Sequence, residues 1–232
     1  MDTTNLIFAG VGGQGVLLIA EMTALAAARV GYDVKQTEVH GVSQRGGSVE
    51  SHVRFGPEVH SPLVMPGQAD VVVGLEKLEG LRYANFLRPS PPTPLPSGIA
   101  GAPTGEGGIL LVNDHEIVPA SVANAAERYP RHALDFLQQK GLRIVALPAS
   151  QCARDLGDGR MANVIMLGAL SALLALPEDV WKETLQERVP ARHRESNLRA
   201  FETGKELASP APNSLPLATE LPVGRGRGQG GG

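Results

Sequence analysis

Cysteine is almost absent from this sequence, because Cys152 is the only thiol among 232 residues. One thiol cannot form an internal disulfide or a cysteine-rich zinc site, and it cannot hold an iron–sulphur cluster, which takes about four thiolates. The sequence therefore excludes a disulfide scaffold. It indicates a reducing compartment, and we expect a cytoplasmic protein.

Basic residues and long apolar runs are also scarce. The 21 Lys and Arg residues are outnumbered by 24 Asp and Glu, which gives a net charge of −3. We expect no nucleic-acid partner, since phosphates are bound by clustered Lys and Arg. No run approaches the roughly 20 apolar residues that cross a membrane, so we expect no membrane association. The apolar content of 42% with 4% aromatic residues predicts a globular fold with an aliphatic core.

Glycine, by contrast, is concentrated near the N-terminus, where residues 8–15 are FAGVGGQG. Gly10, Gly12 and Gly15 fit the G-x-G-x-x-G spacing of a dinucleotide-binding turn. The preceding NLIFA predicts a buried strand, and the following Ala- and Leu-rich run predicts a helix over 16–30. Glycines let a backbone approach a phosphate, and a helix start offers unpaired N–H groups. The turn therefore predicts an anion site.

Two other interpretations of the turn stay open. A dinucleotide-dependent enzyme needs an acidic residue about 20 positions after the turn to hold the ribose. Glu38 is the only candidate there, and Gln14 is unusual in a turn where small residues prevail. Glycines also allow a helix to pack closely on a strand. NAD or FAD binding and packing alone are both alternatives to a phosphate site.

Strands and helices alternate along the rest of the chain. The first forty residues predict a βαβ unit, and residues 49–55 alternate as in a half-exposed strand that pairs antiparallel. The pattern predicts an α/β fold, a three-layer Rossmann-like sandwich with a mostly parallel sheet carrying an antiparallel strand. Further strands are expected over 32–39, 69–75, 108–113 and 142–147, and further helices over 76–87, 132–140, 161–176 and 178–187.

The domain organisation follows from composition. We expect one domain over residues 1–208. Residues 88–108 are dense in proline and glycine, which predicts a flexible surface insertion, and residues 209–232, ending in GRGRGQGGG, predict a disordered tail.

A second glycine-rich loop, HGVSQRGGS, covers residues 40–48. Ser43, Gln44 and Arg45 are donors placed among glycines, and we expect them to contact an anionic ligand or a partner chain. The alternative is a loop that only satisfies its own backbone. His40 is interpreted as a strand-end residue, and Asn163, at the front of a small-residue helix, as a cap that orients a loop.

Together the two motifs resemble a known family. GVGGQGVLLIAE followed by TEVHGVSQRGGSVESHVRFG is similar to the gamma domain of the 2-oxoacid:ferredoxin oxidoreductases. Within that family the chain resembles the small (beta) subunits of the indolepyruvate branch, since pyruvate-type relatives carry a different sequence at positions 43–47. The likeness continues through ADVVVGLEKLEGLRYANFL, GGILLVND, MANVIMLGAL and NLRAFETGKEL, and spans about residues 5–208.

The resemblance implies a subunit of an enzyme complex. A large (alpha) partner subunit would carry thiamine diphosphate, magnesium and 4Fe-4S clusters. The complex would decarboxylate aryl 2-oxoacids such as indolepyruvate, pass electrons to ferredoxin and transfer the acyl group to coenzyme A. This chain would bind no metal or cofactor alone and would be inactive alone. Its GDG at 157–159 resembles the start of a thiamine motif, but positions 184–187 hold no asparagine, so we expect a helix-leading turn.

The expected site residues come from the two loops and one helix, and no catalytic residue is assigned. We expect them to face the cofactor or coenzyme A region, or the partner chain. A stand-alone nucleotide- or phosphate-binding module, and a structural protein whose glycines serve packing, are the alternative functions. The residues are Gly10, Gly12, Gly13, Gln14, Gly15, Glu38, His40, Gly41, Ser43, Gln44, Arg45, Gly46, Gly47 and Asn163.

Overall fold

The computed structural model describes residues 3–40, 47–89, 107–118 and 128–209. Most of the predicted insertion and nearly all of the predicted tail lie outside these ranges. The two ends of the insertion meet, because the N–H of Gly108 donates to the carbonyl oxygen of Arg88 at 2.9 Å.

A 6-stranded sheet in the order β2-β3-β1-β4-β5-β6 forms the centre of the protein. β1, β4, β5 and β6 are parallel, whereas β3 pairs antiparallel with both β1 and β2. The predicted mixed sheet with an antiparallel strand is confirmed. The strands are β1 (Thr4–Val11), β2 (Asp33–His40), β3 (Ser48–Gly56), β4 (Val71–Gly74), β5 (Ile109–Asn113) and β6 (Arg143–Leu147).

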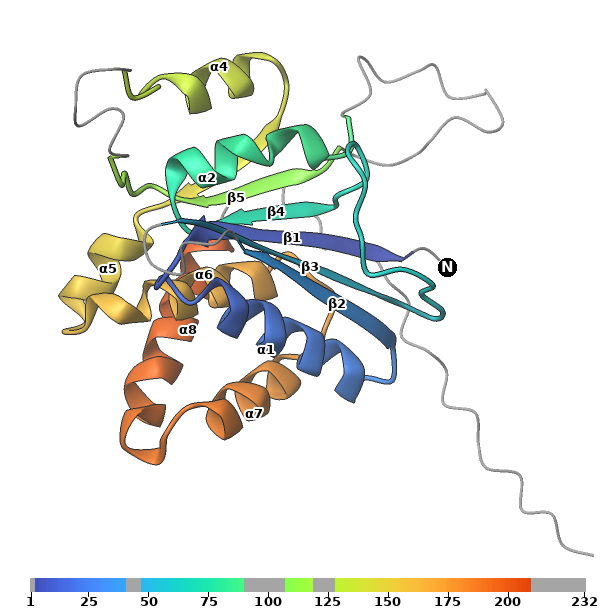
Figure 1. Cartoon of the computed structure of the whole chain (residues 1–232). Helices are drawn as coiled ribbons and strands as arrows, with labels where there is room; N and C mark the ends of the chain where they lie inside the picture. Colours follow the sequence, from blue (N-terminus) through green and yellow to red (C-terminus); the bar gives the residue numbers. More distant parts are fainter. Residues whose placement is uncertain (1–2, 41–46, 90–106, 119–127, 210–232) are drawn as a thin grey trace, which may run out of the picture.

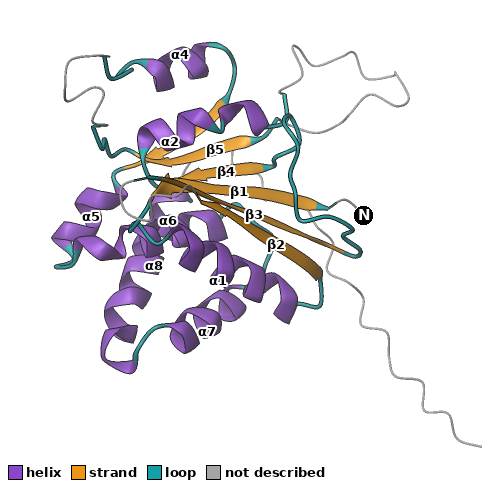
Figure 2. Ribbon diagram, viewed as in Figure 1, coloured by secondary structure: helices purple, strands orange, loops and turns teal. Residues whose placement is uncertain are grey.

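Helices cover both faces of the sheet, which gives the predicted three layers (Figures 1 and 2). α2 and α4 lie on one face, and α1, α5, α6, α7 and α8 lie on the other. The helices are α1 (Val16–Arg29), α2 (Lys77–Arg82), α4 (Ala133–Gln139), α5 (Ala149–Asp155), α6 (Ala162–Ser171), α7 (Glu178–Arg188) and α8 (Arg194–Ala208), with the short 3-10 turns η1 (Ala84–Phe86), η2 (Gly159–Met161) and η3 (Ala191–His193).

The predicted βαβ unit is only partly right, because β1 and β2 are not neighbours. β2 pairs with β3 along its whole length, from Asp33 opposite Gly56 to His40 opposite Val49. β3 then fills the position beside β1. The crossover through α1 therefore passes over one intervening strand, and β2 becomes the edge of the sheet.

β3 is more buried than its alternating sequence predicts. Val49, Val53 and Phe55 belong to the core on the α1 side, as expected. On the opposite side His52 is only 4% exposed, because the segment after β3 folds back and the N–H of Val64 donates to His52 Nδ1 at 3.0 Å. The alternation of polar and apolar residues does not by itself give burial, because a polar side chain can be buried when it forms a hydrogen bond with the backbone.

The helix predictions differ from the structure in four places. The helix expected over 76–87 is divided into α2 and η1, and the helix expected over 161–176 ends at Ser171. α5 and α8 are present without having been predicted. The buried face of α8 consists of Ala200, Phe201, Gly204 and Ala208, which recur at helical spacing, so this helix had a periodic signal that the sequence prediction left out.

Candidate functional site

The first glycine turn joins β1 to α1 and is closed by its own glutamine. The N–H of Gln14 donates to the carbonyl oxygen of Val11 at 3.1 Å, and the N–H of Val11 donates to Gln14 Oε1 at 2.7 Å. Gly10 lies beneath this side chain. Gly15 ends the turn with a φ of 81°, which favours glycine, and is the N-cap of α1. Gln14 thus shapes the turn from within.

The two glycine motifs lie side by side. The N–H of Gly12 donates to the carbonyl oxygen of Gly47 at 2.8 Å, and Gly47 directly precedes β3. The next residue, Ser48, donates its hydroxyl to Glu79 of α2. The end of the second loop is therefore tied both to the first turn and to a helix.

Asn163, the second residue of α6, lies over the start of α1. It is 8% exposed, and a Cβ on Gly15 would collide with its Nδ2. Within the described part of the chain its side chain has no hydrogen-bond partner, although it lines a cavity. The amide therefore lies at the cavity wall, where a ligand can take up its hydrogen bonds.

The cavity has a volume of about 570 Å³ and opens at the carboxyl ends of β1, β4 and β5. After β1 the chain passes to α1 on one face of the sheet, and after β4 it passes to α2 on the other face. Open α/β sheets bind ligands where the chain diverges in this way. The starts of α1 and α6 both border it, and neither has an acidic residue in its first turn or a side-chain cap. Its wall includes Gly13, Gln14, Gly15, Leu75, Asn113, His115, Ser150, Asp158, Arg160, Asn163, Arg188, His193 and Asn197.

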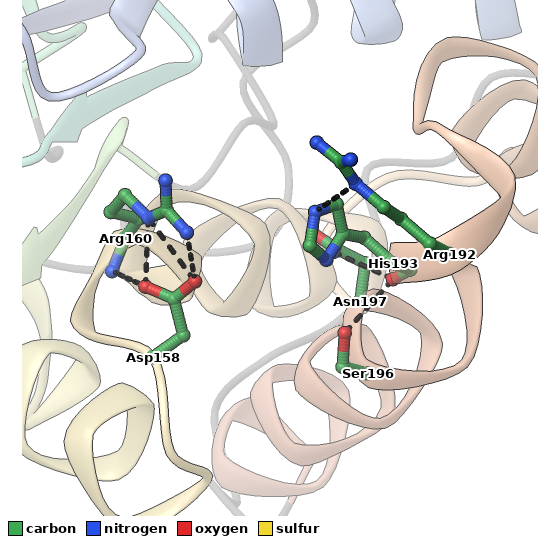
Figure 3. A network of polar contacts seen from close by, with 6 residues as sticks. All are labelled: Asp158, Arg160, Arg192, His193, Ser196 and Asn197. Atoms are coloured by element: carbon green, nitrogen blue, oxygen red, sulfur yellow. Dashed lines mark hydrogen bonds and ion pairs between the residues drawn. The ribbon is translucent and has the colours of Figure 1, made fainter.

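Two polar clusters lie at the cavity, shown in Figure 3; Arg192 joins the second cluster through His193 and is not itself among the described lining residues. Asp158 accepts two hydrogen bonds from the Arg160 guanidinium at 2.7 and 3.0 Å, and these bonds lower the pKa of Asp158 to about 2. Asp158 also caps η2, so the GDG is the helix-leading turn that the sequence predicts. In the other cluster Arg192 Nε donates to His193 Nε2 at 3.0 Å.

The second cluster lies at the start of α8, where Asn197 Nδ2 and Ser196 Oγ donate to the carbonyl oxygen of His193 at 2.8 and 2.9 Å. Asp158 is the only carboxylate among the described lining residues, and it is neutralised by Arg160. The guanidinium of Arg160 is paired with Asp158 and that of Arg188 with Glu21, so the suitability of the cavity for an anion such as a phosphate rests on the two helix starts and the Asn163 amide.

The geometry does not fit the usual dinucleotide fingerprint. That fingerprint needs an acidic residue at the end of the strand beside β1. β3 occupies this position, so Glu38 on β2 is two strand spacings, roughly 10 Å, from β1. Glu38 is also exposed and is not part of the described cavity wall.

The structure brings together only part of the predicted set. Gly13, Gln14, Gly15 and Asn163 line the cavity, Gly12 lies in the adjoining turn, and Gly10 lies near the end of β1. His40 is the last residue of β2. The predictions for Gly41, Ser43, Gln44, Arg45 and Gly46 fall outside the described residues.

Several lining residues escaped the sequence analysis, among them Asn113, Arg160, His193 and Asn197. Asn113 had a usable signal, since a polar residue at the carboxyl end of a buried strand lies at the ligand-binding edge of a parallel sheet. The basic stretch at 192–194 is by itself typical of solvated surface, because nothing local in the sequence indicates that α8 begins at a cavity.

The described residues contain no group of three or more His, Cys, Asp or Glu side chains placed to hold a metal ion. Nor do the described helices include one that is long and apolar enough to span a membrane.

Comparison with known proteins identifies the family. The family model for pyruvate ferredoxin/flavodoxin oxidoreductase matches residues 5–207. Indolepyruvate oxidoreductase subunit IorB of Thermococcus kodakarensis is 36% identical over 215 residues, covering 90% of this chain and 97% of that protein. The same subunit of Pyrococcus horikoshii is 33% identical over 216 residues, with coverage of 90% and 97%.

A solved structure shows the same fold. The 2-oxoglutarate:ferredoxin oxidoreductase from Magnetococcus marinus, with 2-oxoglutarate, coenzyme A and succinyl-CoA bound, matches with a TM-score of 0.68 and 21% identity, covering 94% of this chain and 32% of that chain. The protein described here thus belongs to the pyruvate ferredoxin/flavodoxin oxidoreductase family, as a small subunit of a 2-oxoacid:ferredoxin oxidoreductase.

Proposed function

We propose that this chain is the small subunit of a complex that oxidatively decarboxylates aryl 2-oxoacids, such as indolepyruvate, to acyl-CoA with ferredoxin as electron acceptor. The observation that carries the substrate class is the 33–36% identity, over nearly the whole of both chains, to relatives named for indolepyruvate. The motif Ser43-Gln44-Arg45-Gly46-Gly47 supports the same branch.

A large partner subunit holds the redox groups in this proposal. Cys152 is the single cysteine of the chain, whereas a 4Fe-4S cluster takes about four thiolates. Asp158 caps η2 and pairs with Arg160, so the GDG is engaged in local structure rather than in a magnesium site. Thiamine diphosphate, when bound in the partner, supplies the carbanion stabilisation that decarboxylation needs.

The contribution of this chain is to bind and orient coenzyme A. Its phosphates suit the cavity, because the starts of α1 and α6 border it without a side-chain cap or an acidic residue, and the Asn163 amide lies at its wall. Arg160 and His193 stand at the same wall. The second glycine loop is held next to this cavity through the Gly12–Gly47 hydrogen bond.

The test is co-expression with a large subunit of the same family, followed by viologen-dye reduction with indolepyruvate, 2-oxoglutarate or pyruvate in the presence of coenzyme A. We expect indolepyruvate to give the highest kcat/KM, and no turnover by this chain alone. A preference for 2-oxoglutarate or pyruvate, or turnover by the isolated chain with NAD(P), contradicts the proposal.

Asn163→Asp tests the coenzyme A site within that complex. A carboxylate beside the phosphates is expected to raise the KM for coenzyme A about tenfold or more while kcat at saturating coenzyme A changes little. Asn85→Asp is the matched control, because Asn85 is exposed on η1, outside the cavity wall. Equal KM values for the two variants would remove Asn163 from the site.

A further inference from the structure

The carbonyl oxygen of Leu75 accepts hydrogen bonds from two side-chain amides that come from different parts of the sequence. Gln14 Nε2 donates to it at 3.1 Å, and Asn113 Nδ2 donates to it at 3.0 Å. Leu75 directly follows β4 and is 2% exposed, so neither bond is made in bulk water. This carbonyl connects the glycine turn after β1 to the end of β5.

The orientation of both amides is dictated by further bonds. Gln14 Oε1 accepts from the N–H of Val11, so Nε2 must face Leu75. Asn113 Oδ1 accepts from the N–H of Ser150 at 3.1 Å, so Nδ2 must face Leu75 as well. Asn113 Nδ2 uses its second hydrogen on Ser150 Oγ at 2.8 Å. Every polar atom of Asn113, which is 1% exposed, is thus engaged in holding neighbours.

We infer that Asn113 is a positioning residue for the first glycine turn. It anchors the Leu75 carbonyl to the start of α5, Leu75 in turn anchors Gln14, and Gln14 holds the backbone of the turn at Val11. Asn113, Ser150, Leu75 and Gln14 all line the cavity. The turn therefore keeps its shape through a line of hydrogen bonds across the ends of β1, β4 and β5.

The consequence for catalysis rests on the proposed coenzyme A site. If the turn binds phosphate with its backbone, a looser turn binds more weakly, whereas the chemistry in the partner subunit is unaffected. The signature of a lost Asn113–Leu75 bond is then a higher KM for coenzyme A at constant kcat.

Asn113→Asp isolates the bond to Leu75. An aspartate keeps the Oδ1 that accepts from the Ser150 N–H, and it replaces the donor facing Leu75 by an oxygen. Ser150→Ala removes only the hydroxyl partner and leaves the bond to Leu75. Thr184→Val is the control for buried polarity, because Thr184 is 1% exposed, its hydroxyl donates to Val180 of α7, and it lies outside the described cavity wall.

The measurement is amide hydrogen exchange of residues 10–15 in the assembled complex without coenzyme A, followed by KM and kcat with coenzyme A. For N113D we expect exchange in the turn to quicken about fivefold to tenfold, the effect of one lost hydrogen bond, and the KM for coenzyme A to rise by a similar factor. T184V should leave both within about twofold of the unmodified complex, and S150A should leave the exchange rate of the turn within about twofold.

The positioning role of Asn113 is overturned if hydrogen exchange of residues 10–15 is as slow in N113D as in T184V. It is also overturned if exchange in N113D quickens equally throughout the chain. Quickened exchange in the turn with an unchanged KM for coenzyme A overturns its link to catalysis. A separate outcome contradicts the proposed coenzyme A site: the addition of coenzyme A to the unmodified complex does not slow hydrogen exchange in the turn. In that case the exchange result for N113D still decides whether Asn113 positions the turn.

Discussion

The side-chain amide of Asn163 lies directly over Gly15, so that the start of α6 rests on the start of α1. The contact brings two uncapped helix starts to one cavity, and it requires a residue without a Cβ at position 15. The geometry of the glycine turn and that of α6 are therefore interdependent.

Gly15→Ala is expected to be far more damaging than Gly13→Ala. Both glycines have positive φ, 81° and 101°, so either alanine incurs about 1–2 kcal/mol of backbone strain. Only the Cβ at position 15 also strikes Asn163, which adds an overpacking cost of about 1–3 kcal/mol. Denaturant unfolding of the two variants measures the difference. Equal losses would show that Asn163 moves aside without cost.

The crossing of α6 and α8 gives a second prediction. A Cβ on Gly204 would overlap the carbonyl group of Ile165, and one on Gly168 would overlap that of Phe201. Gly204→Ala should therefore lower the free energy of unfolding by about 3 kcal/mol, the upper range for overpacking.

Helix propensity alone predicts the opposite sign, since alanine is favoured over glycine by about 1 kcal/mol in a helix interior. Thr203→Ala, on the same helix, is the control and should stay within about 0.5 kcal/mol. A stabilised Gly204→Ala variant would mean that the two helices do not cross this closely.

His52 should make stability depend on pH. Burial lowers the pKa of His52 below its ordinary value, and the charge of Glu50 opposes this only in part. The unfolded chain therefore binds the proton more tightly, so the contribution of His52 is complete above about pH 6.5 and is lost as the pH falls from there. Protonation of Nδ1 would also break the bond from Val64.

His52→Asn removes the titration while Oδ1 can replace Nδ1 as acceptor. The free energy of unfolding of this variant should fall less between neutral pH and pH about 5 than that of the unmodified protein. Urea unfolding over that range measures it, with exposed His60 changed to Asn as the control. Parallel pH curves for the unmodified protein and His52→Asn would contradict a neutral, buried His52.

Much of the fold could be predicted because buried strands and glycine stops have strong local signals. β1, β4, β5 and β6 were each expected within a few residues, as were the turn at Gly15 and the start of α1. The position of β3 between β1 and β2 could not be predicted, since strand order depends on which edges pair after the chain folds back. α8 was not predicted because most of its residues are polar and most of its buried residues, such as Gly204, are small, although they recur at helical spacing.

The sequence by itself determined the α/β class, the two glycine motifs, and the family resemblance they carry, because each depends on residues close together in the chain. Tertiary structure alone decided that Glu38 stands apart from the first turn while Asn163 lies upon it, and that Gln14 and Asn113 share the Leu75 carbonyl. These relationships join residues up to well over a hundred positions apart, and only the packing of helices on a sheet of defined strand order brings such groups within bonding distance.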